Sequence, residues 1–355
     1  MGVSKGKRAV LFAVAAAFFL TAAACGQFPM PLDVTSADGS GAGEKPGSDT
    51  QVIYVITELE EYDTEGNFDE RFKYSYDEKG NLIEEINEYT LYDSDDISVS
   101  IDRYVYDDYG NLLKNVNGDG DVLYSYEYSY DDAGNVLTET ETRYKYIRDN
   151  DGNVPTETRT TPYRTEYTEY SYDSIGKRTG KQTYDSNGNL KLSSTYDKNG
   201  NELTCELYDE NGAVSYRIKY AYDEHGNLIF EKREDDGTVK ITEYKKEYNE
   251  WGKYTSVTAF CNGHAVFNIE CKYDERGYLT NLASYNSTGE YSGGVEYTRD
   301  ANGNATQTIT SFHDSLGIAK RRTVFKYQAI EIPSYLAEEI MERQEYLFNK
   351  YAGGI

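Results

Sequence analysis

The segment from residue 216 to residue 228 reads Tyr-Arg-Ile-Lys-Tyr-Ala-Tyr-Asp-Glu-His-Gly-Asn-Leu and decides the fold. In its first half the residues alternate, so that Tyr216, Tyr220 and Tyr222 share one face of an extended chain. A period of two with aromatic and β-branched residues predicts a strand rather than a helix. In its second half Asp223 stands three residues before Gly226, which is the preference of a type I turn closed by a left-handed glycine. The segment therefore predicts a strand followed by a hairpin turn.

The same Asp/Asn-x-x-Gly turn starts at 16 non-overlapping positions between residues 63 and 314, and Tyr directly precedes 12 of them. The Asp or Asn side chain is expected to accept backbone N–H groups inside the turn. Turns of this kind alternate with looser turns in the second half of the chain, so the repeating unit is a two-strand hairpin of about 25 residues. The expected structural turn residues include Asp77, Gly80, Asp107, Gly110, Asp131, Gly134, Asp197, Gly200, Asp223 and Gly226.

This hairpin unit resembles the YD, or Rhs, repeats of bacterial surface and secreted proteins, over roughly residues 54–327. The resemblance implies an all-β antiparallel meander curled into a spiral sheet, which in large family members forms a hollow shell around a C-terminal toxin. Curling is expected independently, because open sheets rarely exceed about ten strands without coiling or splitting. We assign residues 51–327 to this repeat domain, and we expect no toxin domain in the 28 residues after Tyr327.

Residues 328–355 predict a short amphipathic helix. Pro333 is a start signal, and Lys350 lies where a helix C-terminus favours a positive charge. Leu336, Ile340 and Leu347 share one face. We expect this helix to cover one end of the sheet and protect an exposed edge strand, with partner binding as the alternative.

The N-terminus predicts export and lipid anchoring. Residues 1–24 combine a basic start with an apolar run that is shorter than the roughly 20 residues needed to span a bilayer. The run ends Leu-Thr-Ala-Ala-Ala-Cys, which resembles the lipobox of bacterial lipoproteins and implies a diacylglycerol on Cys25. An ordinary secretory signal with an incidental cysteine is the alternative. Residues 25–50 then predict a disordered tether, so we expect an extracytoplasmic protein anchored in the bacterial cell envelope.

Charge and side-chain chemistry exclude several functions. A net charge of −26 repels phosphate backbones, so nucleic acid is excluded as a partner. A glycoside hydrolase needs two carboxylates about 5–10 Å apart in one cleft. The carboxylates outside the turns lie on separate predicted strands with nothing to distinguish them, so no enzyme and no catalytic residue is predicted. These carboxylates include Glu84, Glu85, Glu139, Glu141, Glu206 and Glu231.

No cofactor and no metal site is predicted. The three histidines, His225, His264 and His313, fall on different hairpins. Residues 115–121 and 149–153 carry oxygen-containing side chains at alternate positions, which suggests a calcium site. Neither segment has the terminal bidentate Glu of an EF-hand loop. We therefore expect both segments to form turns.

Three cysteines follow Cys25. Because they can form at most one disulfide with one another, at least one of the three thiols is expected to be free. If residues 262–263 form a two-residue turn, Cys261 faces His264 and Cys271 faces Tyr254. Cys261 and Cys271 would then lie too far apart for a disulfide.

The tyrosine-rich strand face is the candidate binding surface, represented by Tyr216, Tyr220 and Tyr222. Aromatic rings interleaved with carboxylates suit a glycan or protein ligand, and the resemblance to YD repeats also implies carbohydrate binding. The alternative is that these rings form the core of a rolled sheet. We therefore expect a membrane-anchored, non-enzymatic binding or scaffold lipoprotein. A surface carbohydrate-active hydrolase and a remnant of an Rhs-type toxin shell are the other hypotheses.

Overall fold

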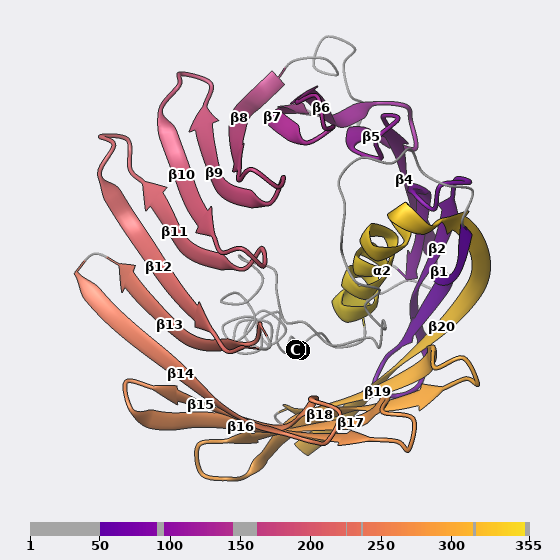
Figure 1. Ribbon diagram of the computed structural model, residues 1–355. Coiled ribbons are helices and arrows are strands. Elements are labelled where there is room, and N and C mark those ends of the chain that lie inside the picture. Colours follow the sequence, from indigo (N-terminus) through magenta and orange to yellow (C-terminus); the bar gives the residue numbers. More distant parts are fainter. Residues whose placement is uncertain are drawn as a thin grey trace, which may run out of the picture.

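The computed structural model describes residues 50–90, 96–144 and 162–351, apart from residues 225, 236, 315 and 316. These ranges contain 20 strands, and each strand pairs antiparallel with the next one in the sequence. The first strand, β1 (Thr50–Tyr62), also pairs with the last strand, β20 (Gly317–Pro333). The sheet is therefore closed into a barrel, which is seen as a ring in Figure 1.

The strands are 6 to 17 residues long, from β5 to β20. The first half of the wall consists of β2 (Phe68–Tyr76), β3 (Leu82–Thr90), β4 (Ile97–Tyr106), β5 (Leu112–Asn117), β6 (Val122–Tyr130), β7 (Val136–Tyr144), β8 (Pro162–Tyr172), β9 (Arg178–Asp185) and β10 (Leu190–Tyr196). The second half consists of β11 (Glu202–Tyr208), β12 (Val214–Tyr222), β13 (Leu228–Asp235), β14 (Thr238–Tyr248), β15 (Tyr254–Cys261), β16 (His264–Tyr273), β17 (Leu279–Asn286), β18 (Tyr291–Arg299) and β19 (Ala305–Asp314).

The prediction of a curled or spiral sheet was wrong, because the two ends of the sheet meet. The β1–β20 ladder runs from Thr50 opposite Pro333 to Tyr62 opposite Arg322, with one irregularity between Ile56 and Glu58. A sheet that coils this far pairs its first and last strands and so removes the unpaired N–H and C=O groups of both edges. The all-β antiparallel meander itself is what the structure contains.

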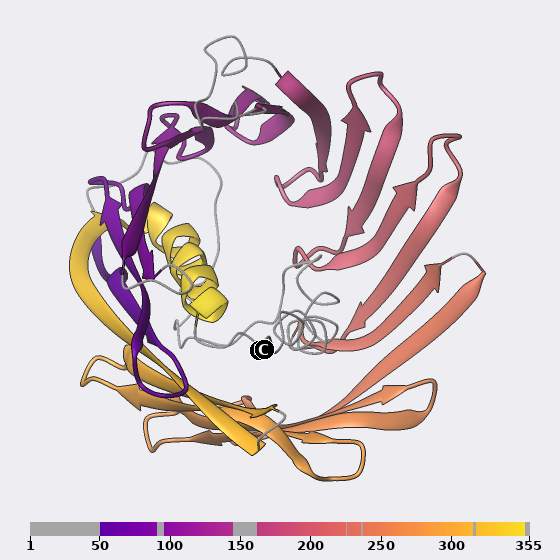
Figure 2. The same ribbon diagram turned by 180° about the vertical axis from the view of Figure 1, so that it is seen from behind.

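After β20 the chain forms a single 3₁₀ turn, η2 (Ser334–Leu336), and the helix α2 (Ala337–Tyr351). The helix lies inside the ring and contacts β1 and β20 (Figures 1 and 2). The expectation that it covers an edge strand was wrong, because closure leaves no edge there to cover. Ala337 and Ile340 of α2 instead form a buried cluster with Ile53, Val55 and Ile332 beside the seam between the first and last strands.

A second buried cluster shows which face of the wall points inward. Leu347 of α2 packs with Phe72 and Tyr74 of β2 and with Phe325 of β20. The residues that alternate with these along the strands point outward. On this outer face Arg71 forms an ion pair with Glu60 at 2.7 Å. On β15 to β17, Val257, Ile269, Cys271, Leu279 and Leu282 form a further buried cluster on the inner face.

The hairpin turns form two rims. We call the rim where β1 begins and β20 leads into α2 the near rim, and its nine turns begin at Asp77, Asp107, Asp131, Asp173, Asp197, Asp223, Asn249, Asp274 and Asp300. The opposite rim is the far rim, where the turns of the same sequence begin at Asp63, Asn117, Asp185, Asp209 and Asn286. On the side formed by β8 to β14, the near-rim turns lie closer to the centre of the ring than the far-rim turns (Figure 1).

The turn beginning at Asp223 shows why the repeat needs its Asp and Gly. Gly226 donates its N–H to the carbonyl oxygen of Asp223 at 3.1 Å, and Asn227 donates its N–H to the Asp223 carboxylate at 2.9 Å. Gly226 has a φ of 80°, a value that L side chains rarely adopt. The same bonds and the same left-handed glycine occur at Asp77 and Gly80, Asp107 and Gly110, Asp131 and Gly134, and Asp197 and Gly200.

The tyrosines at the near rim tie each strand to the strand before it. Tyr222, for example, donates its hydroxyl to the carbonyl oxygen of Glu202 at 2.8 Å. The same kind of bond, at 2.7–3.0 Å, is made by Tyr76, Tyr106, Tyr128, Tyr172, Tyr273 and Tyr327. Arg299 replaces the tyrosine in one position and donates to the carbonyl oxygen of Leu279 at 3.0 Å. These bonds link neighbouring near-rim turns around the ring.

Within the described part of the chain, no helix has the length and apolar character needed to cross a membrane.

Candidate functional site

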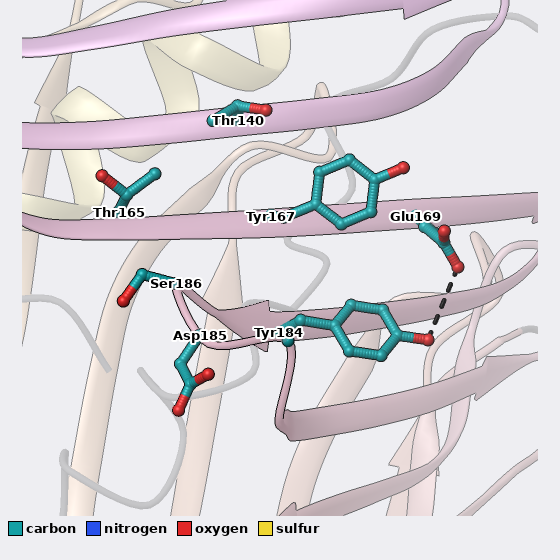
Figure 3. A pocket seen from close by; sticks show the side chains of 8 residues that line it. Thr140, Thr165, Tyr167, Glu169, Tyr184, Asp185 and Ser186 are labelled. Atoms are coloured by element: carbon teal, nitrogen blue, oxygen red, sulfur yellow. Dashed lines mark hydrogen bonds between the residues drawn. The ribbon is translucent and has the colours of Figure 1, made fainter.

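A groove of about 740 Å³ lies on the outer wall, across β7, β8 and β9 (Figure 3). The strand register defines its side: counted from the inward-facing Phe72 through β3 to β8, Tyr128, Glu139 and Thr168 point inward. Tyr167, next to Thr168 on β8, therefore points outward. The groove is lined by Thr140, Thr165, Tyr167, Glu169, Tyr184, Asp185, Ser186 and Gly188.

Two tyrosines and one carboxylate dominate this groove. Tyr167 and Tyr184 are directly opposite each other on β8 and β9, with ring centroids 6.1 Å apart and ring planes at 40°. Tyr184 donates its hydroxyl to Gln182 at 3.0 Å and, over a longer distance of 3.4 Å, to Glu169 (Figure 3). The side chains stand on paired strands, which hold them more precisely than a loop would.

The electrostatics of the groove keep both phenols protonated. Two effects raise the pKa of Tyr184 and of Tyr167 above the usual tyrosine value. The larger is loss of hydration, and the smaller is the negative charge of Glu169. Two neutral hydroxyls therefore lie beside one carboxylate at neutral pH. Such a group can donate and accept hydrogen bonds while its rings offer aromatic surface.

The second carboxylate of the groove, Asp185, already has a structural role. Its oxygens accept bonds from the backbone N–H groups of Asn187 and Asn189 at 2.9 Å and from the Asn189 side-chain amide at 3.0 Å. The Asn189 hydrogen bonds lower the pKa of Asp185 to about 2. An aspartate held ionised by its own turn is a poor proton donor, so the chemistry of this groove favours binding over general acid catalysis.

Two other outward tyrosines at the far rim, Tyr62 and Tyr208, also meet a glutamate, but in each case that glutamate is paired. Tyr62 donates to Glu60 and Tyr208 donates to Glu206, both at 2.8 Å. An arginine lies on each of these carboxylates: Arg71 at 2.7 Å from Glu60, and Arg217 at 2.6 Å from Glu206. Glu169 forms no ion pair with any residue that the structure describes. Among the described residues its negative charge therefore has no ion-pair partner.

The tyrosines selected from the sequence lie elsewhere, on the inner face of β12. Tyr216 and Tyr220 share this face with Ile218, whose side chain is buried. The rings of Tyr220 and Tyr222 are 6.5 Å apart, and the Tyr222 hydroxyl is used in its bond to Glu202. The neighbouring β13 carries an inward ion pair between Glu231 and Arg233 with side chains only 7% and 14% exposed. These tyrosines therefore line the inner face of the barrel.

The carboxylates considered from the sequence are not brought together. Glu84 and Glu206 point outward and pair with Arg103 and Arg217. On the inner face, Glu141 pairs with Arg143, Glu231 pairs with Arg233, and Glu139 accepts the Tyr170 hydroxyl at 3.0 Å. Burial raises the pKa of Glu85, which lies opposite Asp102 in the ladder.

The side chains that could bind a metal are also not brought together in the described part of the chain. The described residues contain no group of three or more His, Cys, Asp or Glu side chains that could hold a metal ion. Asn117 begins a far-rim turn, in which its side-chain oxygen accepts the N–H groups of Asp119 and Asp121 at 3.0 and 2.9 Å. His225 and the second calcium-like segment, 149–153, lie outside the described residues.

The thiols of Cys205, Cys261 and Cys271 are free, and Cys205 and Cys271 are buried. The prediction that Cys261 faces His264 is confirmed by the ladder. The prediction that Cys271 faces Tyr254 was wrong, because a bulge between Ala259 and Phe260 shifts the register by one residue.

Tyr167, Glu169 and Tyr184 were not selected from the sequence. One signal was available: Tyr184 precedes a far-rim turn, and tyrosines before far-rim turns point to the opposite face of the wall from those before near-rim turns. The sequence does not show which glutamates lack an arginine partner, because that depends on the register between strands. Cys25 and its tether lie outside the described residues.

Comparisons with known proteins give distant likenesses only. The chain matches no protein-family model and no curated protein. A porin-like protein from Bacteroides uniformis is 12% identical, with 77% of this chain and 98% of that chain covered at a TM-score of 0.33. The Tc holotoxin pore of Photorhabdus luminescens is also 12% identical, at a TM-score of 0.19, and this chain spans 17% of its length.

Proposed function

We propose that the protein is a non-enzymatic saccharide-binding module, held at the outside of a bacterial membrane by a lipid on Cys25. The observation that carries this proposal is the pair of outward tyrosines, Tyr167 and Tyr184, set around Glu169 in a groove of a rigid wall. Aromatic rings bind the apolar faces of sugar rings, while hydroxyl and carboxylate groups bind the sugar hydroxyls.

The position of the groove suits this role. β1 begins at the near rim with Thr50, so a tether of residues 25–50 joins the barrel there. The groove extends to the far-rim turn that contains Asp185 and Ser186. In the proposed arrangement the near rim faces the membrane, and the groove is presented away from it.

A second candidate function, carbohydrate hydrolysis, is favoured by one carboxylate pair. Glu61 and Glu70 are directly opposite each other on β1 and β2. Burial, together with the charge of Glu70, raises the pKa of Glu61 to about 8. A carboxylic acid that is still protonated at neutral pH is what general acid catalysis of glycoside cleavage requires. This pair lies outside the groove, which is why we rank hydrolysis second.

Binding of cell-wall and host glycans to the full chain in detergent tests the proposal, with Tyr167→Ala and Tyr184→Ala as variants. We expect each variant to weaken binding of the responding glycan about tenfold, equivalent to about 1.4 kcal/mol. Tyr208→Ala is the matched control, because Tyr208 is another outward tyrosine at the far rim. Equal binding by the tyrosine variants and the control would reject this groove as the site.

Hydrolysis has its own test. Incubation of the same glycans with the protein, followed by chromatography of the products, measures cleavage directly. Cleavage that disappears in Glu61→Gln and persists in Tyr167→Ala would favour the second candidate.

A further inference from the structure

The uncompensated carboxylate of Glu169 indicates which saccharides the groove selects, an inference that rests on the proposed function. In the pairs of Tyr62 with Glu60 and of Tyr208 with Glu206, a guanidinium group of the chain completes the unit. In these two pairs the group that completes the tyrosine–glutamate unit is therefore a nitrogen cation. At Glu169 the described chain supplies no such cation, so the position is available to a ligand.

We propose that the groove binds a positively charged amino group carried on a sugar chain, that is, a saccharide with free rather than acetylated amines. Three groups converge on this position: the Glu169 carboxylate and the rings of Tyr167 and Tyr184, whose centroids are 6.1 Å apart (Figure 3). Aromatic faces attract cations, and carboxylates pair with them.

Hydrogen-bond capacity agrees with an ammonium group. An ionised carboxylate has about four acceptor sites, and the neighbouring phenols use only part of that capacity. An ammonium group carries three N–H donors, which the remaining Glu169 sites and the phenol oxygens can accept. An acetylated amine carries no charge and has a single N–H, so it would satisfy less of this capacity.

The charge of the whole protein acts in the same direction. A net charge of −26 repels acidic glycans and attracts cationic ones over a distance set by the ionic strength. Within the groove, Lys191 lies 3.5 Å from Asp185 and offsets that carboxylate. Glu169 is therefore the group on which the selection depends.

Binding of glucosamine oligomers and of N-acetylglucosamine oligomers of equal length, measured by isothermal titration on the full chain in detergent at pH 6, tests this proposal. We expect the glucosamine oligomers to bind about tenfold more tightly. We expect Glu169→Gln to abolish the difference between the two ligands, and high salt to reduce it. Glu270→Gln is the matched control, because Glu270 is another outward glutamate that accepts a tyrosine hydroxyl, from Tyr285 at 3.3 Å.

The outcomes separate this inference from the function on which it rests. Equal binding of the two oligomers, with both weakened by Tyr167→Ala, would overturn the ammonium selection and retain the saccharide site. Binding of neither oligomer would overturn the ammonium selection, while binding of another cell-wall or host glycan that Tyr167→Ala weakens would retain the saccharide site. Binding of a lysine-rich peptide, with no binding of any glycan tested, would overturn both proposals and would identify a polypeptide as the ligand. Circular dichroism of Glu169→Gln shows that any loss is not caused by unfolding.

Discussion

The near rim and the far rim are built from the same turn sequence, yet their surroundings differ. A Cβ atom added to any of seven near-rim glycines would lie within 4 Å of another residue, as at Gly80, Gly110, Gly134, Gly176, Gly226, Gly277 and Gly303. No such neighbour lies within 4 Å of the glycines in the five far-rim turns of this sequence, Gly66, Gly120, Gly188, Gly212 and Gly289. Most near-rim turns are therefore packed against other parts of the molecule, Gly200 and Gly252 being exceptions, whereas these far-rim glycines face open space.

The tyrosines before these turns differ in the same way. Near-rim tyrosines such as Tyr222 donate to backbone carbonyl oxygens on the inner face, and Tyr130 and Tyr248 donate to the aspartates of neighbouring near-rim turns. Far-rim tyrosines such as Tyr184 and Tyr208 point outward and meet side-chain carboxylates. One dipeptide, Tyr-Asp, therefore holds the barrel together at one rim and presents side chains at the other.

The largest expected effect is at the near rim, where α2 packs against the seam. Ile340 is 1% exposed and contacts Ile53, Val55 and Ile332. Ile340→Ala should lower the free energy of unfolding by about 2–5 kcal/mol, because it leaves a cavity in a buried cluster. Urea unfolding followed by circular dichroism measures this loss. Tyr346→Ala, on a side chain 69% exposed in the same helix, should change it by less than about 0.5 kcal/mol. Equal losses would contradict the docking of α2.

A pair of glycine substitutions compares the rims directly. Gly80 and Gly66 have φ values of 85° and 86°, so an alanine at either position carries a backbone cost of about 1–2 kcal/mol. At Gly80 the new Cβ would also lie 3.3 Å from Ile340, whereas at Gly66 it meets nothing within 4 Å. Gly80→Ala should therefore destabilise the protein by about 1–3 kcal/mol more than Gly66→Ala. The midpoint of urea unfolding decides this, and identical midpoints would show that the near-rim packing is not tight.

Removing single hydroxyl groups sharpens the comparison further. Tyr222→Phe leaves the carbonyl oxygen of Glu202 without its 2.8 Å partner and should cost about 1 kcal/mol. Tyr208→Phe removes an outward hydroxyl whose partner, Glu206, keeps its bond to Arg217, so its cost should be smaller, below about 0.5 kcal/mol. Thermal unfolding of the two variants under one condition gives the difference. A reversed order would contradict the distinction between the rims.

At the far-rim end of β1 the expected effect depends on pH and is smallest in acid. Burial and the charge of Glu70 raise the pKa of Glu61 to about 8, above its usual value of 4.5. The folded state thus binds more protons than the unfolded state between these values, so this group makes stability fall as pH rises from about 4.5 to about 8. Glu61→Gln should change little below about pH 4.5, where Glu61 is largely protonated in both states, and should stabilise the protein increasingly as pH rises from about 4.5 to about 8. Unfolding midpoints measured from pH 5 to pH 9 test this, and a variant with the same pH slope as the parent would refute it.

Local chemistry made the hairpins predictable, and long-range geometry limited the rest. The Asp-x-x-Gly pattern at Asp223 and Gly226 specifies a turn through bonds within five residues, and the alternation before it specifies a strand. Closure depends on the total twist and coil of 20 strands, to which no single residue corresponds, so the sequence supported a curled sheet equally well. The position of α2 could not be predicted either, because its apolar face fits an edge and an interior alike.

The candidate groove was missed for a related reason. Tyr216, Tyr220 and Tyr222 alternate with other residues along one strand, and the structure places Tyr216 and Tyr220 on its inner face beside Ile218. Tyr167 and Glu169 become a site only when β9 places Tyr184 beside them, and only because no arginine of the described chain reaches Glu169 as Arg71 reaches Glu60. The register between strands, rather than the composition, determines which tyrosines point outward and can contact a ligand.

The pairing of β1 with β20 also orders events in time. The first strand to leave the ribosome or to cross a membrane has its outer partner at the other end of the chain, with Leu59 opposite Phe325. Until that partner is delivered, β1 has one unpaired edge, and such an edge pairs readily with another chain. Contacts between residues this distant form slowly, since a long loop must first be closed. A chain interrupted before β20 would therefore leave one edge of β1 unpaired and prone to aggregation, so pairing with β20 is the step that protects the barrel.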